Sequence, residues 1–272
     1  MENNRIPVFA AREEDEQLAR ELAARLDSRL ILQEEDIAGL PLWLRYDEKG
    51  LSLTDGVMTV RADLARTARR MRQSNLHKEL LVRAAKVRGG SGQDSGQTGE
   101  GAAPGEKTQP LAIDATAGLG DDALLLAAAG FSVRLYEADP VIAALLGDGL
   151  RRAALETDLP LLTQAVSRMT LFAEDSIPAM RSLPCRPDVI LLDPMFPERK
   201  KSASIGKKFQ ILQQLEKPCG DEEELLAAAM AAGPRKIVIK RPRKGPHLAG
   251  IRPDYTLEGS AIRYDCILPA GR

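Results

Sequence analysis

The sequence predicts an α/β fold: a doubly wound, mostly parallel sheet of seven strands with helices on both faces, preceded by a small α/β subdomain. Three observations lead to this prediction. Residues 111–129 form an apolar segment, a glycine turn and an alanine- and leucine-rich segment, in that order. Short apolar segments then alternate with helix-like segments as far as residue 240. Two of these apolar segments lead into a carboxylate, Glu137 and Asp193, as expected where such a sheet binds its ligand.

Residues 1–73 are expected to form the small subdomain. Apolar residues recur at helical spacing over residues 13–26, which predicts an amphipathic helix. We expect Trp43 and Tyr46 to belong to a core, with an RNA-stacking platform as the less favoured alternative. Short strands bounded by turn residues are predicted at residues 6–9, 30–32, 42–46, 51–54 and 57–60.

The next part of the chain connects this subdomain to a large domain, residues 111–272. Residues 61–72 carry five arginines, and the excess of one sign favours a helix that contacts phosphates over a merely solvated helix face. Residues 74–88 are predicted to form a connecting helix with an apolar stripe. Residues 89–110 are rich in Gly, Ser and Gln and have little apolar surface, which predicts a flexible linker.

The glycine turn after the strand at residues 111–113 indicates a site for a nucleoside. Gly118 and Gly120 allow the backbone to approach a ligand closely, because no Cβ intervenes. Asp114 lies where the strand ends, at the edge where open α/β sheets bind ligands. Glu137 follows it by 23 residues, about the spacing of a carboxylate that binds a ribose diol.

The residues after the turn narrow the choice of nucleoside. The turn has two glycines, not the three of a dinucleotide-binding motif. Asp121 and Asp122 lie where a pyrophosphate would require free helix N–H groups. These acids disfavour NAD or FAD and favour a positively charged ligand, of which S-adenosylmethionine is the common case.

A second motif, Asp193-Pro-Met-Phe-Pro197, follows an apolar strand at residues 188–192. The exocyclic amine of a nucleobase is a poor nucleophile, because its lone pair is delocalised into the ring. Asp193 and the Pro194 carbonyl can accept its hydrogens and orient the nitrogen, while Phe196 stacks on the base. The motif therefore indicates methylation of a base amine. The alternative is an Asp-Pro turn with Phe196 in the core.

The remaining elements complete the sheet. Asp175 and Ser176 precede a short predicted helix, so they are candidates for an N-cap, for an adenine contact, or for both. A terminal hairpin is expected to place an antiparallel last strand on the sheet. Helices are predicted at residues 121–129, 140–154, 177–183 and 221–232, and strands at residues 132–137, 169–173, 236–240, 255–258 and 262–268.

Two basic runs follow strands of the large domain and are the candidate RNA contacts. The first lies next to the proposed base pocket, with five Lys or Arg within ten residues, and the second begins at the end of the strand at residues 236–240. The cations are Arg199, Lys200, Lys201, Lys207, Lys208, Lys240 and Arg241.

Composition excludes several classes of protein. Three widely separated cysteines argue against a disulfide framework or a zinc cluster and suit a reducing compartment. Two histidines argue against a histidine-based metal site. No apolar run approaches membrane length and the N-terminus lacks a signal pattern, so we expect a cytoplasmic protein that needs no metal. The net charge is −1, so affinity for RNA would have to come from local patches.

From about Ser74 to the C-terminus the chain resembles the RsmJ family of 16S ribosomal RNA (guanine-N2) methyltransferases. The resemblance rests on Asp114-Ala-Thr-Ala-Gly-Leu-Gly120, on Asp193-Pro-Met-Phe-Pro197 and on the Lys/Ser run that follows. It implies a Rossmann-like class I methyltransferase fold with S-adenosylmethionine as the cofactor. It also implies methylation of the N2 amine of a guanosine in 16S ribosomal RNA, as free RNA or in the small ribosomal subunit.

The resemblance also assigns cofactor-binding positions. The family usually has Arg where this chain has Asp121, and a basic residue where it has Ala138. Two other functions stay open: an amino-methyltransferase acting on DNA adenine or protein glutamine, and a non-catalytic RNA-binding protein with a methyltransferase fold. The positions implied by the resemblance are Asp121, Asp122, Glu137, Ala138, Asp175, Ser176 and Asp193, which add to Asp114, Gly118 and Gly120 of the turn.

Overall fold

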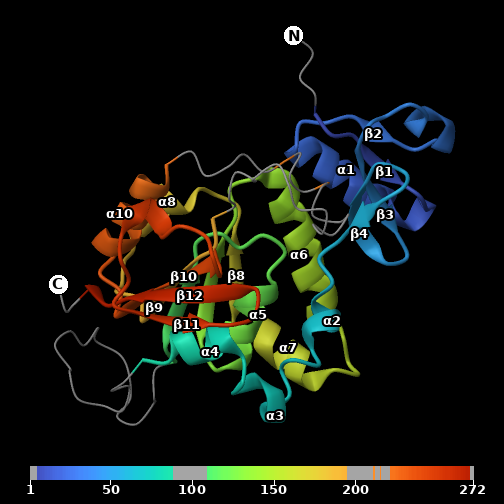
Figure 1. The fold of residues 1–272 in the computed structure, drawn as a ribbon. Coiled ribbons are helices and arrows are strands. Elements are labelled where there is room, and N and C mark those ends of the chain that lie inside the picture. The colour runs from blue at the N-terminus through green and yellow to red at the C-terminus, as the bar shows by residue number, and fades with distance from the viewer. Residues whose placement is uncertain (1–4, 88–108, 195–210, 212–214, 216–220, 270–272) are drawn as a thin grey trace.

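The structure is a computed structural model that describes residues 5–87, 109–194, 211, 215 and 221–269. It contains a sheet of seven strands and a smaller sheet of five, which packs against the long helix α6 (Pro140–Ala154) (Figure 1). The large sheet has the order β11-β12-β10-β9-β6-β7-β8. Its strands are β6 (Leu111–Asp114), β7 (Ser132–Tyr136), β8 (Met169–Phe172), β9 (Val189–Leu192), β10 (Lys236–Pro242), β11 (Tyr255–Glu258) and β12 (Ile262–Ile267).

The strands β10, β9, β6, β7 and β8 of the large sheet are parallel to one another, and β12, the last strand along the chain, is antiparallel to its neighbours. β12 lies between β10 and β11 and runs antiparallel to both, with Lys240 opposite Tyr264 in the β10–β12 register. The prediction of a seven-stranded, mostly parallel sheet with an antiparallel last strand is therefore confirmed.

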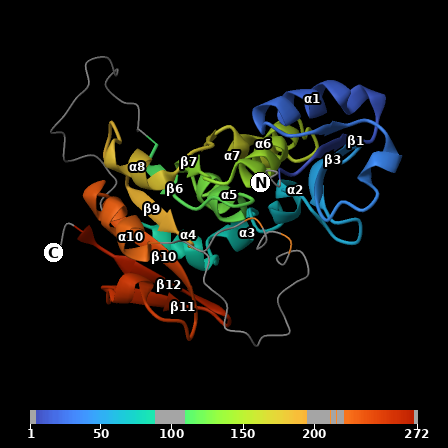
Figure 2. The same cartoon turned by 90° about the horizontal axis from the view of Figure 1, so that it is seen from above.

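Helices cover both faces of this sheet (Figure 2), as the alternation along its strands requires. Ala112 of β6 packs into a core with α4, α5 and α7, whereas its neighbour Ile113 packs on the opposite face with α8 and α10. The sequence did not indicate α7. None of the described helices is long and apolar enough to cross a membrane. The helices named above as packing on the two faces of the large sheet are α4 (Leu80–Ala85), α5 (Asp121–Ala128), α7 (Pro160–Val166), α8 (Ser176–Arg181) and α10 (Glu222–Ala231).

The small N-terminal sheet has the order β2-β1-β3-β4-β5 and is packed by helix α1. Trp43 and Tyr46 are each 7% exposed, so they are core residues and not a stacking platform. All five predicted strands are present, within a few residues of the expected limits. The elements are β1 (Val8–Ala10), α1 (Glu16–Arg25), β2 (Leu30–Ile31), β3 (Trp43–Asp47), β4 (Gly50–Thr54) and β5 (Thr59–Val60).

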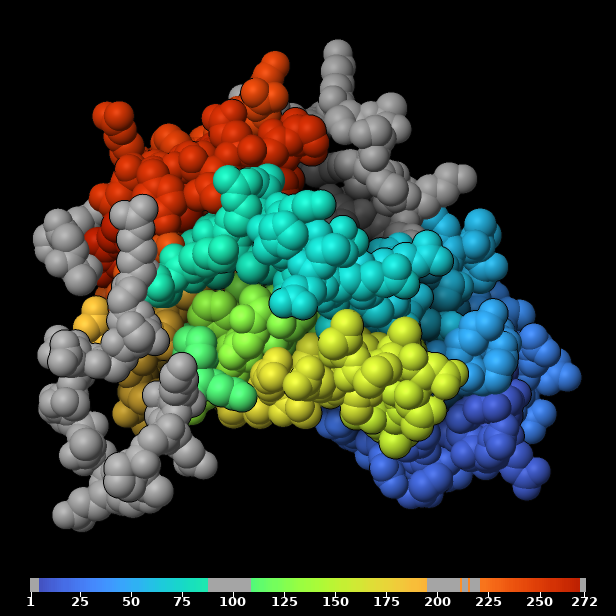
Figure 3. Space-filling model, turned by 90° about the horizontal axis from the view of Figure 1, so that it is seen from below, coloured from blue at the N-terminus to red at the C-terminus, as the bar shows by residue number. Residues whose placement is uncertain are grey.

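The segment that joins the two sheets differs from the prediction. In place of a basic helix and a connecting helix it forms the short helices α2 (Leu64–Thr67), α3 (Gln73–Leu76) and α4. The chain turns between them because Arg72 and Glu79 have extended ψ angles of 136° and 125°. This segment crosses one face of the molecule between the C-terminal strands and α7 (Figure 3). Most of the predicted linker, residues 89–110, lies outside the described residues, and the proposed domain limits stay predictions.

One buried carboxylate ties the small sheet to α6. Asp148 accepts the Leu51 N–H at 2.9 Å, Arg152 Nε at 2.7 Å and Arg151 Nη2 at 2.6 Å, with its own side chain 3% exposed. Gly50 has φ +88°, and a Cβ there would lie 2.4 Å from Arg152 Nε. A glycine is therefore needed for the two elements to approach so closely.

We expect Asp148→Ala to lower the free energy of unfolding at pH 7 by about 2–3 kcal/mol, because the arginines and the Leu51 N–H lose their acceptor. Burial alone would raise the pKa of Asp148, but the hydrogen bonds from Arg152, Arg151 and Leu51 hold it below its ordinary value. Such a carboxylate stabilises the fold above its unfolded pKa of about 4, and this stability is lost as pH falls through the folded pKa.

The difference between wild type and Asp148→Ala should therefore shrink as pH falls from about 7 to about 3. Urea unfolding over this range measures it, with the exposed Asp158→Ala as the control. Equal stabilities of wild type and Asp148→Ala at pH 7 would contradict the assignment.

Candidate active site

Neighbouring strands of the large sheet bring the candidate side chains to one edge. β6 ends at Asp114, Glu137 follows β7, Asp193 follows β9, and β10 carries Lys240 near its end. These four strands are adjacent and parallel, so their carboxyl ends lie side by side. This is the edge at which open α/β sheets bind their ligands.

The two glycines of the turn have different physical roles. Gly118 (φ +52°) has nothing within 4 Å of the place where a Cβ would lie, so its backbone faces open space. Gly120 (φ +84°) caps the start of α5, and a Cβ there would lie 2.6 Å from Leu146 Cδ1. Gly118 thus leaves room for a ligand, whereas Gly120 is required by packing against α6.

Glu137 is held beside this open space. Its two carboxylate oxygens accept the backbone N–H groups of Gly118 and Asp139, each at 2.9 Å. Burial raises the pKa of Glu137, and these backbone N–H donors oppose the rise. A carboxylate oxygen that accepts one N–H retains a lone pair, so this pair of oxygens fits the two hydroxyls of a ribose.

Asp114 is the most deeply buried acid of the edge. Its carboxyl is 2% exposed and accepts the Thr116 N–H at 3.2 Å. Burial, reinforced by the nearby Asp122 carboxylate, raises the pKa of Asp114 to about 8. The group is therefore largely protonated at neutral pH, and the arrival of a cation beside it would favour the charged form.

Lys240 joins two of the predicted acids. Its Nζ lies 2.6 Å from Asp122 Oδ2 and 2.8 Å from Asp193 Oδ2. Although burial opposes it, the two carboxylates raise the pKa of Lys240 above its ordinary value, so the amine is charged. Burial raises the pKa of Asp193, and Lys240 counteracts this rise. One cation thus holds the helix α5 start and the β9 end in a fixed arrangement.

Two contacts of this edge were missed at the sequence level. The Thr116 hydroxyl accepts the Asp193 N–H at 2.7 Å and so connects the glycine turn to the second motif. The Thr67 hydroxyl hydrogen-bonds to the Asp121 carboxylate, which connects α2 to α5. Only for Thr116 did the sequence hold a signal, because it is the one hydroxyl-bearing residue between Asp114 and Gly120.

The residues after β8 lie on the same edge, next to Glu137. Asp175 is exposed and accepts the Ile177 N–H at 2.9 Å, which makes it the N-cap of α8. Ser176 is buried at 6% exposure, whereas Ala138 is exposed. The N-cap interpretation is confirmed, and an adenine contact of Asp175 stays a prediction.

The second basic run does not form the expected surface. Arg241 is 1% exposed; its Nε donates to the Pro246 carbonyl at 2.9 Å and its Nη1 lies 3.4 Å from Glu222 Oε1. Contact with RNA through Arg241 was therefore a wrong expectation. Successive residues of a strand point to opposite faces, so Lys240 turns towards α5 and Arg241 towards α10.

Of the remaining predicted site residues, Pro194 is buried at the end of the described segment 109–194. The predicted stacking residue and the first basic run lie outside the described residues. Within the described parts of the chain, no group of three or more His, Cys, Asp or Glu could hold a metal ion. The predicted residues outside the description are Phe196, Arg199, Lys200, Lys201, Lys207 and Lys208.

Comparison with known proteins agrees with this geometry. Residues 25–269 match a family model described as a putative SAM-dependent methyltransferase. The chain is 37% identical to ribosomal RNA small subunit methyltransferase J of Thioalkalivibrio sulfidiphilus, over 97% of this chain and 98% of that protein. A protein of the same name from Neisseria meningitidis is 34% identical over 86% of each chain.

A solved structure is similar over nearly the whole length. The crystal structure of a SAM-dependent methyltransferase from Neisseria gonorrhoeae superposes with a TM-score of 0.70 at 26% identity. The match covers 98% of this chain and 97% of the other. The similarity therefore includes the small N-terminal sheet as well as the large one.

Asp114→Asn should stabilise the protein at alkaline pH. A carboxyl whose folded pKa lies near 8, above its ordinary 3.8, binds its proton more tightly in the folded state. Wild-type stability should therefore fall as pH rises from about 4 to about 8, and the neutral Asn variant should lack this fall. At pH 8 we expect the variant to be more stable by about 2 kcal/mol or more. Parallel urea-unfolding curves at pH 5 and pH 8 test this, and an equal fall in both proteins would refute it.

Proposed function

This chain belongs to the family of SAM-dependent methyltransferases represented by ribosomal RNA small subunit methyltransferase J, and we propose that it methylates a guanosine N2 amine in 16S ribosomal RNA. One observation carries the proposal: the Gly118–Glu137 cradle and the Asp193 motif meet at one sheet edge. The first fits a nucleoside cofactor and the second fits a base amine. The choice of guanine N2 comes from the RsmJ-like form of the motif at Asp193.

S-adenosylmethionine, when bound, supplies a methyl group that is activated by a positively charged sulfur. Glu137 would hold the ribose hydroxyls, with Ala138 beside it, and Asp175 with Ser176 would bind the adenine. The methionine end would lie along Gly118, Gly120 and Asp121, where Asp114 and Asp122 supply the negative charge that a cation requires. Because its pKa is raised, Asp114 would be largely protonated before the cofactor binds, and the cation of the cofactor would then favour its ionised form.

Asp193 and Pro194 would orient the substrate amine. The carboxylate and the Pro194 carbonyl each accept one N–H of the amine, so that the nitrogen lone pair faces the methyl group. Thr116 fixes the backbone of Asp193 at 2.7 Å and Lys240 fixes its carboxylate at 2.8 Å. Phe196, outside the described residues, would stack on the extruded base.

The chemical step needs little from the protein besides position. A nitrogen–carbon bond forms as the carbon–sulfur bond breaks, and the proton leaves the nitrogen afterwards to solvent. Asp193 therefore does not have to be a strong base. Most of the rate gain would come from holding nucleophile and methyl group in line.

The substrate would be 16S ribosomal RNA, either free or assembled in the small ribosomal subunit, and the reaction would take place in the cytoplasm. We propose that the cations outside the described residues contact the RNA backbone near the target base. These are Arg199, Lys200, Lys201, Lys207 and Lys208.

A methyl-transfer assay tests the proposal directly. Purified protein and tritiated S-adenosylmethionine are incubated with small ribosomal subunits from cells that lack this protein, with 16S RNA, with DNA and with protein. We expect label in N2-methylguanosine after nucleoside analysis. Label in adenine or in glutamine would show that the substrate is DNA or protein and not 16S RNA. Tight cofactor binding without any transfer would favour a non-catalytic RNA-binding protein.

Asp193→Ala should reduce turnover by about 10³-fold or more, because the amine loses its orienting acceptor. The thermal stability of the fold should change little, since Lys240 keeps Asp122 as its partner. Single-turnover transfer and calorimetry measure the two effects. Asp158→Ala, which removes an exposed acid just before α7, is the matched control. If Asp193→Ala turns over as fast as this control, Asp193 does not orient the substrate amine.

Lys240→Met should shift the acidic limb of the pH–rate profile upwards. Burial and the Asp122 carboxylate raise the pKa of Asp193, whereas Lys240 and, to a smaller extent, Arg241 lower it. Removing the Lys240 amine therefore removes the larger of the two lowering effects. We expect the midpoint of the limb to rise by about one pH unit or more. Lys240→Arg keeps the charge and serves as the control. An unchanged midpoint in Lys240→Met would show that Lys240 does not keep Asp193 ionised.

A further inference from the structure

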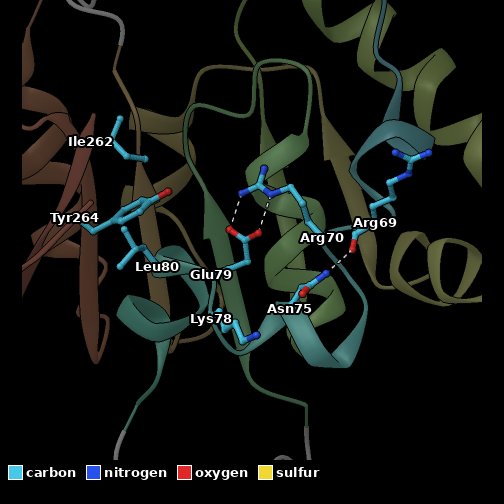
Figure 4. Close-up of a pocket in the computed structure, with 8 residues that line it drawn as sticks. All are labelled: Arg69, Arg70, Asn75, Lys78, Glu79, Leu80, Ile262 and Tyr264. Atoms are coloured by element: carbon cyan, nitrogen blue, oxygen red, sulfur yellow. Dashed lines mark hydrogen bonds and ion pairs between the residues drawn. The ribbon is translucent and has the colours of Figure 1, made fainter. Parts of the chain in front are cut away.

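A pocket of about 490 Å³ lies between the α2–α4 segment and β12 (Figure 4). The segment contributes the charged side chains of the pocket, and β12 contributes Ile262 and Tyr264. A volume of this size is within the range of small-ligand sites. No residue of this pocket has a part in the cofactor and amine contacts proposed above.

The charges of the pocket are unevenly paired. Arg70 and Glu79 form a bidentate ion pair with distances of 2.8 and 2.7 Å, so they neutralise each other. Arg69 and Lys78 are exposed, and neither side chain makes an ion pair with any residue that the structure describes. These two cations lie on opposite sides of the Arg70–Glu79 pair (Figure 4), so the pocket has two separate positions for anionic groups. A guanidinium and an amine of this kind are typical phosphate-binding groups.

Tyr264 gives the pocket a polar interior group. The side chain is 3% exposed, so its ring offers little face for a base to stack on. Its hydroxyl lies on the side of the Arg70–Glu79 pair (Figure 4), and no hydrogen bond of it is found among the described residues. Burial, and next the Asp122 carboxylate, raise the pKa of Tyr264, so the hydroxyl keeps its proton and can donate it in a hydrogen bond. Leu80 supplies an apolar wall.

The pocket adjoins the candidate active site on two sides. Tyr264 is the β12 partner of Lys240, whose amine holds both Asp122 and Asp193. On the other side Thr67, two residues before Arg69, hydrogen-bonds to the Asp121 carboxylate. A polymer with one residue at Asp193 would therefore have its neighbouring residue within reach of the pocket.

We propose that this pocket binds a nucleotide adjacent to the target guanosine in a single-stranded stretch of RNA, with its two flanking phosphates on Arg69 and Lys78 and its base or ribose edge on the Tyr264 hydroxyl. The inference rests on the proposed function, because it takes Asp193 as the position of the methylated base. Single strands are the form of RNA in which bases and their edges are accessible to such groups. Because Arg69 and Lys78 are both cations without an ion pair among the described residues, the pocket favours a polyanion such as RNA over an apolar or a cationic ligand.

The test combines binding with methylation. Removing two phosphate contacts in Arg69→Ala/Lys78→Ala should weaken binding of a 16S RNA transcript and reduce the slope of log affinity against log salt concentration by about 1.4. Filter binding over a range of KCl concentrations measures both. In the methylation assay KM for the RNA should rise, whereas kcat and the affinity for S-adenosylmethionine should stay at wild-type values.

Two further variants sharpen the result. Tyr264→Phe removes only the hydroxyl and should weaken RNA binding about five-fold, the effect of one hydrogen bond. Arg20→Ala/Lys49→Ala removes the same two charges from exposed positions of the N-terminal subdomain and should leave the affinity within about two-fold of wild type.

The outcomes separate this inference from the proposed function. Wild-type affinity and salt slope in Arg69→Ala/Lys78→Ala would overturn the inference even if the wild-type enzyme methylates RNA. Weaker methylation of assembled subunits with unchanged binding of free RNA would also overturn it, in favour of a ribosomal-protein contact. Absence of N2-methylguanosine with the wild-type protein would instead reject the proposed function, while the RNA-binding measurements would still report on the pocket.

Discussion

The ion pairs of Lys240 with Asp122 and Asp193 hold together the three elements on which the candidate site depends. One amine is shared between the start of α5 and the residue after β9, and it comes from the strand next to β9. A partly buried pair of like charges would be unstable without this cation, and the cation itself would be costly to bury without the acids. The three side chains are therefore mutually dependent. The position of each is set by the other two, which gives the fixed geometry that orienting a weak nucleophile demands.

The local distribution of charge on this protein matters more for ligand binding than its net charge. Acids surround the glycine turn, where Asp114, Asp122 and Glu137 lie, and this is where a cationic cofactor would bind. Arg69 and Lys78 lie outside this ring, in the pocket beside β12. A chain with a net charge of −1 can thus present a negative interior to the cofactor and a positive rim to a polyanion. Asp121, which departs from the pattern of the family, joins the two regions through its hydrogen bond to α2.

Much of this arrangement was predictable from the sequence, because strand ends in a parallel sheet share an edge. The apolar strands fixed the order of elements, and Asp114, Glu137 and Asp193 were correctly expected to lie together at that edge. The error concerned neighbouring residues of one strand. Lys240 and Arg241 were treated as one basic cluster, although alternation sends them to opposite faces of β10. The breaks that divide the two helices predicted over residues 61–88 into α2, α3 and α4 were also missed, since they are decided by packing against the sheet and not by local periodicity.

The insertion of β12 between β10 and β11 has a consequence that no local pattern could reveal. Residues 240 and 264 are far apart in the chain, yet the antiparallel register makes Lys240 and Tyr264 direct neighbours on one face. The pocket at Tyr264 is thereby joined to the acids held by Lys240. A parallel strand at the same place would reverse the chain direction and change which residue of β12 lies beside Lys240. The antiparallel last strand, a feature of fold topology, thus determines which side chains adjoin the amine-orienting motif and where a substrate strand would have to pass.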